Sequence, residues 1–199
     1  MGQTFKGEYM PLSFKKTNRF LLFLIIIIGT VGIGSYYWFH QSTTEPIYPY
    51  NPAQDRTALV AMFTPNAFWL SDDPDEKHAV ETFEYNLDHR SSSRSSFDEG
   101  NMTIYVYRDD EATKGFVSYY PTSWSVAKIL YIVVDDKYRR RGYAEKLMQY
   151  ALDAIKQKGF KRVELVTRVI NKRAQGLYKK FGFKQGWDDG TLVSFERTL

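Results

Sequence analysis

Cysteine is absent from this sequence, and the absence excludes several kinds of site at once. Without cysteine the chain has no disulfide framework, no thiolate metal site and no cysteine nucleophile. Histidine is scarce too, and His40, His78 and His89 show no metal-ligand spacing. We therefore expect a protein that binds no metal. The redox compartment stays open, because a cysteine-free chain suits either side of a membrane.

A large charge excess is also missing. The formal net charge is +4 and the pI is about 9.0. A basic excess of this size indicates nucleic-acid binding only when it is concentrated on one face, so we expect no nucleic-acid partner. The 199 residues, 43% of them hydrophobic, are enough for one globular domain with a substantial core.

Residues 20–39, FLLFLIIIIGTVGIGSYYWF, carry no charge. A helix rising about 1.5 Å per residue crosses the roughly 30 Å hydrocarbon core over about this length. The aromatic residues 36–39 stand where an interfacial belt would lie. A cleaved signal peptide, with Gly32 and Gly34 near the cut, is the alternative. The long apolar run and the aromatic residues after the glycines favour an uncleaved single-pass transmembrane helix, which makes the lipid bilayer a partner.

The charges around this segment predict its orientation. Arg56 is the one basic residue within about twenty positions after the segment, whereas four precede it: Lys6, Lys15, Lys16 and Arg19. The positive-inside rule then places the N-terminus in the cytoplasm and the main domain across the membrane. The chain accordingly divides into a basic tail (1–19), a transmembrane helix (20–39), a polar linker (40–46) and a folded domain (47–199).

The folded domain mixes helix and strand patterns. Residues 47–51 read as a strand, and Pro52 suits the first position of a helix. An acidic, Ser-capped start at 71–76 opens a second helix, 102–120 reads as a hairpin, and 126–134 as a buried strand. There follow a helix after Gly142 that ends at Gly159, a strand at 162–168, a helix at 171–182 and a strand at 192–199. This order predicts a mixed α/β (α+β) fold with a mixed sheet.

The stretch YRRRGYAEKL, residues 138–147, lies between the buried strand and the helix after Gly142. A glycine at such a helix start exposes backbone N–H groups at the positive end of the helix dipole, which favours phosphate. Arginine side chains can fork onto the phosphate oxygens. The spacing matches neither a P-loop nor a dinucleotide-binding fingerprint.

Two motifs resemble the GNAT superfamily of N-acetyltransferases. Arg139-x-x-Gly142-x-Ala144 matches its pyrophosphate motif, [QR]-x-x-G-x-[GA], although Asp136 replaces a proline common in that loop. About thirty residues later, NKRAQGLYKKFGF is similar to the second signature, N-x-x-A-x-x-x-Y-x-x-x-G-F. The resemblance covers residues 128–183 well and implies a GNAT-like acyl-CoA N-acyltransferase fold, with acetyl-CoA as co-substrate.

The resemblance also implies which residues hold acetyl-CoA. The backbone of residues 139–144 would bind the pyrophosphate, the strand end at 132–134 would pair with the pantetheine arm in a gap between two parallel strands, and Asn171 would contact that arm. The implied cofactor-binding residues are Ile132, Val133, Val134, Arg139, Arg140, Arg141, Gly142, Tyr143, Ala144 and Asn171. Of the three arginines, Arg139 alone falls on the motif, and Asn171 is equally a helix N-cap.

Tyr178 is the candidate catalytic residue by the same resemblance. A neutral amine attacks the acetyl carbonyl, an oxyanion forms, and coenzyme A leaves as a thiolate that needs a proton. Tyrosine suits the role of proton donor because its ordinary pKa, about 10, exceeds that of a typical thiol. The Val134 N–H is a candidate oxyanion donor by family analogy. No general base is assigned: Glu164, Glu81, Glu84, a water relay or a partly neutral amine would each serve.

The leading interpretation is a membrane-anchored N-acetyltransferase that acts on a primary amine, and this amine belongs to a small molecule or to a protein. A catalytically degenerate acyl-CoA-binding or membrane interaction module is the alternative, and a homodimer is an open option. The topology conflicts with the chemistry, since acetyl-CoA is expected in the cytosol while charge counting places the domain outside it. The side of the membrane on which the domain lies therefore stays open.

Overall fold

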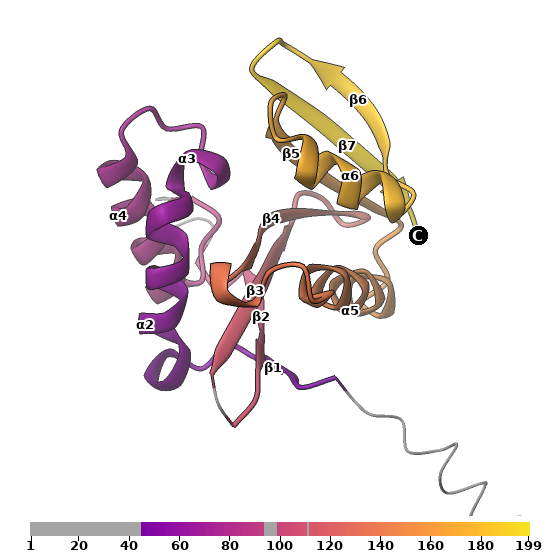
Figure 1. Ribbon diagram of the computed structural model, residues 1–199. Coiled ribbons are helices and arrows are strands. Elements are labelled where there is room, and N and C mark those ends of the chain that lie inside the picture. The colour runs from indigo at the N-terminus through magenta and orange to yellow at the C-terminus, as the bar shows by residue number, and fades with distance from the viewer. Residues whose placement is uncertain (1–44, 94–98, 111) are drawn as a thin grey trace, which may run out of the picture. The chain divides into compact units, whose positions relative to one another are not determined.

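The computed structural model describes residues 45–93, 99–110 and 112–199. In these ranges seven strands form one sheet in the order β1-β2-β3-β4-β5-β7-β6 (Figure 1). The strands are β1 (Ile47–Pro49), β2 (Thr103–Arg108), β3 (Thr113–Pro121), β4 (Val126–Val134), β5 (Arg162–Arg168), β6 (Lys184–Asp188) and β7 (Leu192–Thr198). The helices are α2 (Pro52–Phe63), α3 (Ala67–Leu70), α4 (Glu76–His89), α5 (Tyr143–Gln157) and α6 (Lys172–Lys180). The mixed α/β fold predicted from the sequence is confirmed.

The predicted basic tail, the transmembrane helix and most of the linker lie outside the described residues. No helix within the described ranges is long and apolar enough to cross a membrane. The last two residues of the predicted linker belong to the folded unit. The Glu45 carboxylate lies 2.9 Å from Lys146 Nζ, and the Arg108 N–H donates to the Pro46 carbonyl at 3.0 Å.

Helices cover both faces of the sheet (Figure 1). On one face α2 and α4 pack over a core in which the rings of Phe63 and Phe83 stack with centroids 4.0 Å apart. On the other face α5 and α6 pack over a core that includes Leu147 and Tyr178. The predicted apolar stripe of α5 is buried along its whole length, because its spacing keeps one side of the helix against the sheet.

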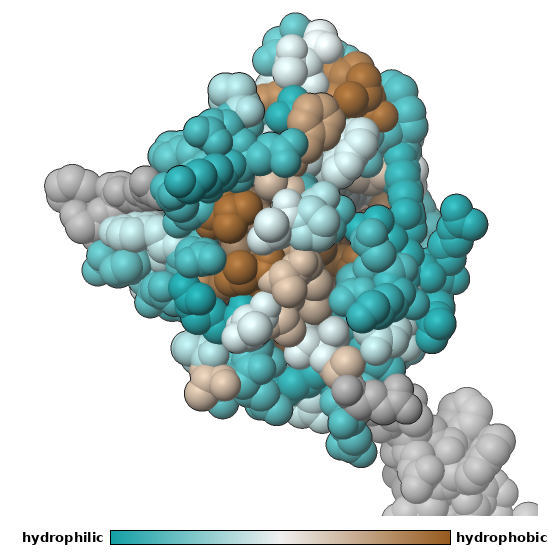
Figure 2. All heavy atoms as spheres, turned by 60° about the vertical axis from the view of Figure 1, so that its left-hand side comes forward, coloured by the Kyte–Doolittle hydropathy of each residue, from teal (hydrophilic) through white to brown (hydrophobic). Residues whose placement is uncertain are grey.

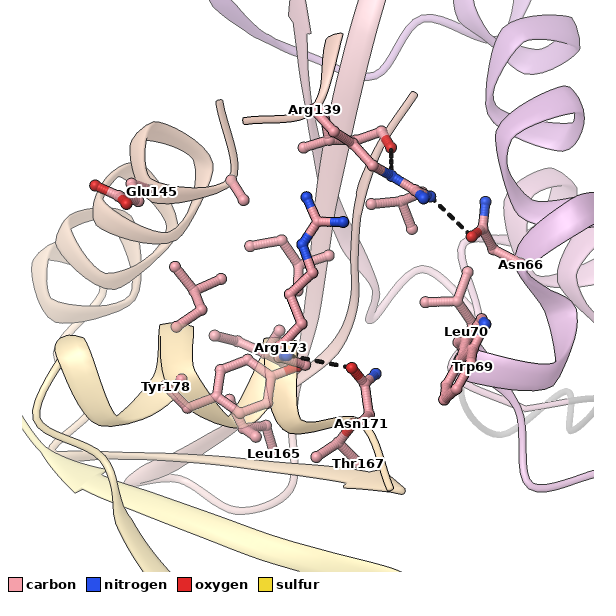
Figure 3. Close-up of a pocket in the computed structure, with 18 of the residues that line it drawn as sticks. Asn66, Trp69, Leu70, Arg139, Glu145, Leu165, Thr167, Asn171, Arg173 and Tyr178 are labelled. Atoms are coloured by element: carbon pink, nitrogen blue, oxygen red, sulfur yellow. Dashed lines mark hydrogen bonds between the residues drawn. The ribbon is translucent and has the colours of Figure 1, made fainter. Parts of the chain in front are cut away.

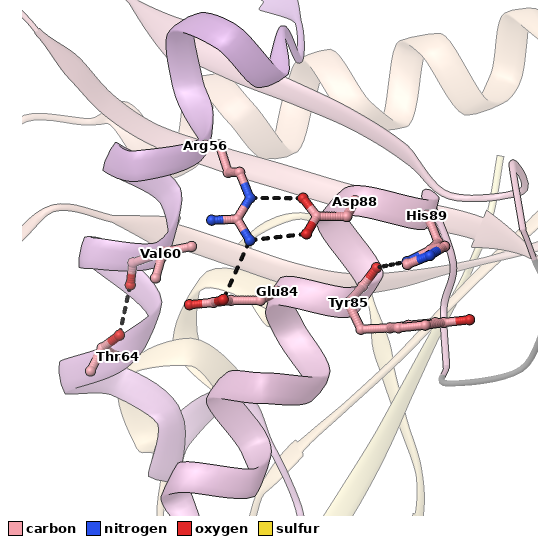
Figure 4. Close-up of polar contacts among 7 residues, drawn as sticks. All are labelled: Arg56, Val60, Thr64, Glu84, Tyr85, Asp88 and His89. Atoms are coloured by element: carbon pink, nitrogen blue, oxygen red, sulfur yellow. Dashed lines mark hydrogen bonds and ion pairs between the residues drawn. The ribbon is translucent and has the colours of Figure 1, made fainter.

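Two ion-pair networks link α2 to its neighbours. At the surface the Arg56 guanidinium donates to both Asp88 carboxylate oxygens, at 2.7 and 2.9 Å, and to Glu84 at 3.3 Å (Figure 4). This clip joins α2 to α4 and lowers the pKa of Asp88 by its hydrogen bonds. One residue earlier, the fully buried Asp55 carboxylate accepts from Arg108 Nη1 of β2 at 2.7 Å. Because Asp55 is fully buried, removing one partner of this second pair would destabilise the fold more than removing one partner of the surface clip.

A β-bulge in β4 positions the site. Ser118 of β3 pairs with Tyr131 and Tyr119 pairs with Ile129, so Leu130 is an extra residue with no partner in β3. Because side chains alternate along a strand, this insertion exchanges the two faces. Ile129 packs in the core under α5, whereas Tyr131 packs in the core under α2 and α4. The bulge also bends β4 at the level where its pairing with β5 has ended.

Candidate active site

The two parallel strands β4 and β5 separate along most of their length. They pair only between Val126–Lys128 and Arg162–Glu164, at the N-terminal ends of both strands. Beyond these residues the sheet has a gap between its fourth and fifth strands. The sequence predicted such a gap through its family resemblance, and the strand pairing shows it.

The end of β4 directs backbone groups into this gap. Asp135 N–H donates to the Lys114 carbonyl of β3, so Asp135 faces β3 and its neighbour Val134 faces away from it. Ile132, two residues earlier, faces the same way as Val134. Their N–H and C=O groups therefore point toward the gap, where β5 offers no partner. This is the arrangement that an extended, amide-containing ligand arm requires.

A turn with two left-handed residues connects β4 to α5. Arg140 has φ of +64° and Gly142 has φ of +82°. The first hydrogen bond of α5 runs from Lys146 N–H to the Gly142 carbonyl at 3.1 Å. The N–H groups of Tyr143, Ala144 and Glu145 therefore have no partner within the helix, and no side chain caps it at Gly142. Three N–H groups at the positive end of a helix form a ready anion site.

The gap and the helix start belong to one cavity of about 760 Å³. Ten of the eleven predicted site residues line it: Ile132, Val133, Val134, Arg139, Arg140, Gly142, Tyr143, Ala144, Asn171 and Tyr178. The exception is Arg141, whose guanidinium lies over the Tyr138 ring, 5.7 Å from its centroid, and outside the cavity. Apart from Arg141, the residues that the sequence motifs identified, in β4, the turn after it, α5, and α6 with its N-cap, therefore lie around one cavity in the fold.

The described part of this cavity is strongly basic. Five cationic side chains line it, and Glu145 supplies the one carboxylate among the described lining residues. Glu145 is itself paired with Lys180, with 2.6 Å between Nζ and Oε2. The cations are Arg139, Arg140, Lys172, Arg173 and Lys180. Such an excess favours a ligand that carries several negative charges.

The Arg139 side chain differs from the expectation that it forks onto phosphate. Its Nε donates to the Val134 carbonyl at 3.1 Å, and its Nη2 donates to Asn66 Oδ1 at 2.9 Å. The same Nη2 forms an ion pair with Asp136. In Figure 3 the guanidinium reaches toward Asn66, on the side of the cavity opposite α6. The motif arginine is thus occupied by contacts within the protein.

Tyr178 projects from α6 into the cavity and is 6% exposed (Figure 3). Burial raises the pKa of its hydroxyl to about 12, and the Thr167 side chain offsets part of the rise. Its ring packs on Phe195, 5.6 Å between centroids, which fixes its direction. The hydroxyl therefore keeps its proton at any physiological pH.

Asn171 serves the start of α6 as its sequence position predicted. Its side-chain oxygen accepts from the Ala174 N–H at 3.2 Å, which makes it the N-cap. It also lines the cavity, so capping and ligand contact are compatible at this residue. Arg173, two positions on, extends into the middle of the cavity in Figure 3. No ion-pair partner of Arg173 occurs among the described residues.

Sequence reasoning missed the wall of the cavity that faces α6. We call residues 66–70 the aromatic wall; Asn66, Trp69 and Leu70 of this segment line the cavity. Trp69 is 43% exposed. Figure 2, in which the side of the molecule that carries α2 and α4 is turned forward, shows a hollow with hydrophobic residues inside and hydrophilic residues around it. Thr167 and Arg173 were missed as well, although Arg173 lies inside the second signature.

The three glutamates considered as general bases lie elsewhere. Glu164 pairs with Arg162 at 2.9 Å, Glu84 with Arg56 at 3.3 Å, and Glu81 with Lys77 at 4.0 Å. None of the three lines the cavity. Among the described residues, no group of three side chains is placed to hold a metal ion.

Residues 64–183 match the acetyltransferase (GNAT) family, and this range is more than half of the chain. The protein belongs to the GNAT acetyltransferase family. It is 39% identical over 75 residues to a protein of Bacillus subtilis (strain 168) provisionally named as a ribosomal protein bS18-alanine N-acetyltransferase, covering 36% of this chain and 50% of the relative. It is 26% identical over 98 residues to human N-acetyltransferase 8, covering 47% of this chain and 43% of the relative. The chain thus spans about half the length of the curated relatives it matches.

The fold also matches solved structures. The crystal structure of PaiA N-acetyltransferase from Thermoplasma acidophilum, in complex with coenzyme A, superposes with a TM-score of 0.61 at 18% identity. The match covers 77% of this chain and 98% of that one. At this identity the likeness shows a shared fold, which agrees with the sheet order and the gap described above.

Proposed function

We propose that the protein is an acetyl-CoA-dependent N-acetyltransferase that acetylates a primary amine by direct attack in a ternary complex. One observation carries the proposal: a single cavity joins the free N–H groups of α5, the open strand edge of β4 and the hydroxyl of Tyr178. The family membership supports the same chemistry. Acetyl-CoA, when bound, supplies the activated acetyl thioester.

The residues present fit this co-substrate. The N–H groups of residues 143–145 would bind the pyrophosphate, and a Cβ at Gly142 would meet no protein atom within 4 Å, so the space before them is open. Arg140, Lys172 and Arg173 add positive charge at the cavity surface without an ion-pair partner among the described residues. The backbone of Ile132 and the N–H of Val134 would face the pantetheine arm, whereas the Val134 carbonyl already accepts from Arg139 Nε at 3.1 Å.

Tyr178 would donate a hydrogen bond to the leaving sulfur. Its pKa of about 12 exceeds the roughly 8.5 of a thiol by about 3.5 units, so complete proton transfer is uphill by about 5 kcal/mol. The residue therefore acts best as a donor whose proton moves only as the sulfur develops charge. The Val134 N–H faces the gap and would donate to the carbonyl oxygen of the acetyl group.

The acceptor amine would approach from the aromatic wall, opposite α6. With Glu145 paired to Lys180, the described lining residues hold no free carboxylate to remove its proton. We therefore propose that the amine enters in its neutral form or loses its proton to water.

Membrane anchoring through residues 20–39 is part of the proposal, supported by their uncharged length. A C-terminal tag in intact membrane vesicles tests the orientation. Charge counting expects protection from protease added on the cytoplasmic side, and digestion there would instead place the domain where acetyl-CoA is abundant.

The Tyr178→Phe variant tests the catalytic role. It keeps the ring packing, so we expect acetyl-CoA binding to persist while kcat falls by about 10²- to 10⁴-fold. Release of free thiol would be followed with four amines: spermidine, tobramycin, polylysine and a peptide with a free N-terminal alanine. Full activity of Tyr178→Phe would remove the tyrosine from the mechanism.

The lack of an assigned base favours a second candidate, a module that binds acyl-CoA without turnover. Calorimetry with acetyl-CoA separates the two. Binding without turnover of any of the four amines would support the module, whereas turnover of one of them would exclude it.

A further inference from the structure

We propose that Arg139 is a positioning residue that holds the aromatic wall in place through the side chain of Asn66, and that it is not a phosphate ligand. The inference rests on the proposed function, because it assigns Arg139 to the acceptor side of that site. The two residues are 73 positions apart, and 2.9 Å separate their donor and acceptor atoms.

Both the nitrogen and the oxygen of the Asn66 side-chain amide form hydrogen bonds. Its Nδ2 donates to the Met62 carbonyl in the last turn of α2 at 2.8 Å, while its Oδ1 accepts from Arg139. Asn66 occupies the N-cap position of α3, where an asparagine side chain usually caps the helix, yet it makes no such bond. The amide is thus used for the contact with Arg139 instead of for its own helix.

The aromatic wall depends on contacts of this kind. It contains α3, a helix of four residues, which is too short to be stable alone. From the end of β5, Arg168 donates to the Phe68 carbonyl and, at 2.9 Å, to the Ser71 carbonyl. Arg139 supplies the matching bond from the turn between β4 and α5. The wall is therefore held by one arginine at the end of β5 and by one in the turn that follows β4.

Arg139 is also poorly placed as a phosphate ligand. Its Nε and Nη2 are engaged by Val134, Asn66 and Asp136, and its guanidinium points toward the wall (Figure 3). Arg140 and Arg173 line the same cavity as the anion site at the start of α5, and neither has an ion-pair partner among the described residues. Loss of the Arg139 side chain would then loosen the wall more than it weakens phosphate binding.

The experiment uses the full chain with Trp38, Trp124 and Trp187 replaced by phenylalanine, so that Trp69 is the remaining tryptophan of four. Acrylamide quenching reports how accessible Trp69 is, and calorimetry gives the Kd of acetyl-CoA. The variants are Arg139→Met, Asn66→Leu and the double substitution, with Asn66→Asp as the rescue that keeps an acceptor oxygen. Thr64→Val is the control, because Thr64 lies two residues before Asn66 and the substitution removes a side-chain bond to the Val60 carbonyl (Figure 4).

We expect both single variants to increase Trp69 quenching about equally, and the double variant to add little, because the two residues act through one bond. The Kd of acetyl-CoA should change less than about threefold, while the KM of any of the four amines that is turned over rises roughly tenfold, as for one lost charged hydrogen bond. Asn66→Asp should restore that KM in part, because it keeps the acceptor for Arg139 but loses the donor to the Met62 carbonyl. Thr64→Val should match the parent protein.

The opposite pattern overturns the inference: Arg139→Met weakens acetyl-CoA more than tenfold and leaves Trp69 quenching unchanged. Additive effects of the two substitutions would also contradict a shared bond. If the parent protein binds no acetyl-CoA, the proposed function fails, while the quenching data still decide whether Arg139 holds the wall.

Discussion

Replacing Gly142 with alanine should damage acetyl-CoA binding far more than it damages the fold. Gly142 has φ of +82°, a conformation that costs other residues about 1–2 kcal/mol. A Cβ there would meet no protein atom within 4 Å, so backbone strain is the whole structural cost. For a chain of this size each kcal/mol lowers Tm by about 2–4 °C, which gives an expected loss of about 2–8 °C.

The expected loss of acetyl-CoA affinity in Gly142→Ala has a different cause from the loss of stability. The added methyl group would occupy space that no protein atom fills, at the residue directly before the N–H groups of Tyr143, Ala144 and Glu145, where the pyrophosphate is proposed to lie. Loss of one charge-assisted hydrogen bond costs about 1.5–3 kcal/mol. The Kd of acetyl-CoA should therefore rise by about 10- to 150-fold.

Gly159 provides a matched control beyond the other end of the same helix. It follows the other end of α5 with φ of +89°, a Cβ added to it would likewise meet no protein atom within 4 Å, and it lies outside the cavity. Gly159→Ala should lower Tm about as much as Gly142→Ala and leave the Kd unchanged. Calorimetry and thermal melts of both variants make the comparison. Equal acetyl-CoA affinity in the two variants would refute the assignment of the anion site.

Two further predictions concern stability. Asp55→Ala should lower the unfolding free energy by about 3–5 kcal/mol, because it leaves Arg108 unpaired beside a fully buried position. Arg56→Ala removes the exposed clip and should lower it by less than about 1 kcal/mol. Urea titration measures both values. Burial raises the pKa of Tyr178 to about 12, so below pH 10 neither the folded nor the unfolded tyrosine ionises and stability is unaffected. Between about pH 10 and 12 the unfolded tyrosine ionises first, and this residue alone should lower the unfolding free energy by up to about 2.7 kcal/mol. Tyr131 has a similarly raised pKa, so Tyr178→Phe should still lose stability in this range, but less than the parent protein.

The elements around the cofactor end of the cavity were predictable from sequence. The strands at 126–134 and 162–168 have the bounds expected, because each is a continuous apolar or alternating run that must be buried. The turn at Gly142 was predictable because only glycine adopts its backbone conformation cheaply. Each of these signals comes from residues that are close together in the sequence, and so do the backbone groups that are proposed to bind acetyl-CoA.

The acceptor end was not predictable for a physical reason. The helix α3 has four residues, too few to show a periodic pattern, and bonds from distant arginines hold it. Strand β6 was missed because all five of its residues are exposed, and only pairing with β7 makes it a strand. The contact between Asn66 and Arg139 joins segments that no local pattern relates.

The early end of the β4–β5 pairing leaves two strand edges inside the sheet instead of at its rim. Unpaired edges are usually hazards, because another chain can add to them. Here the opening lies between the aromatic wall and α6, which limits what can enter it. In the proposed complex, the pantetheine arm of acetyl-CoA would pair with the free edge of β4 as an additional strand, and the gap in the sheet would be filled only when acetyl-CoA is bound.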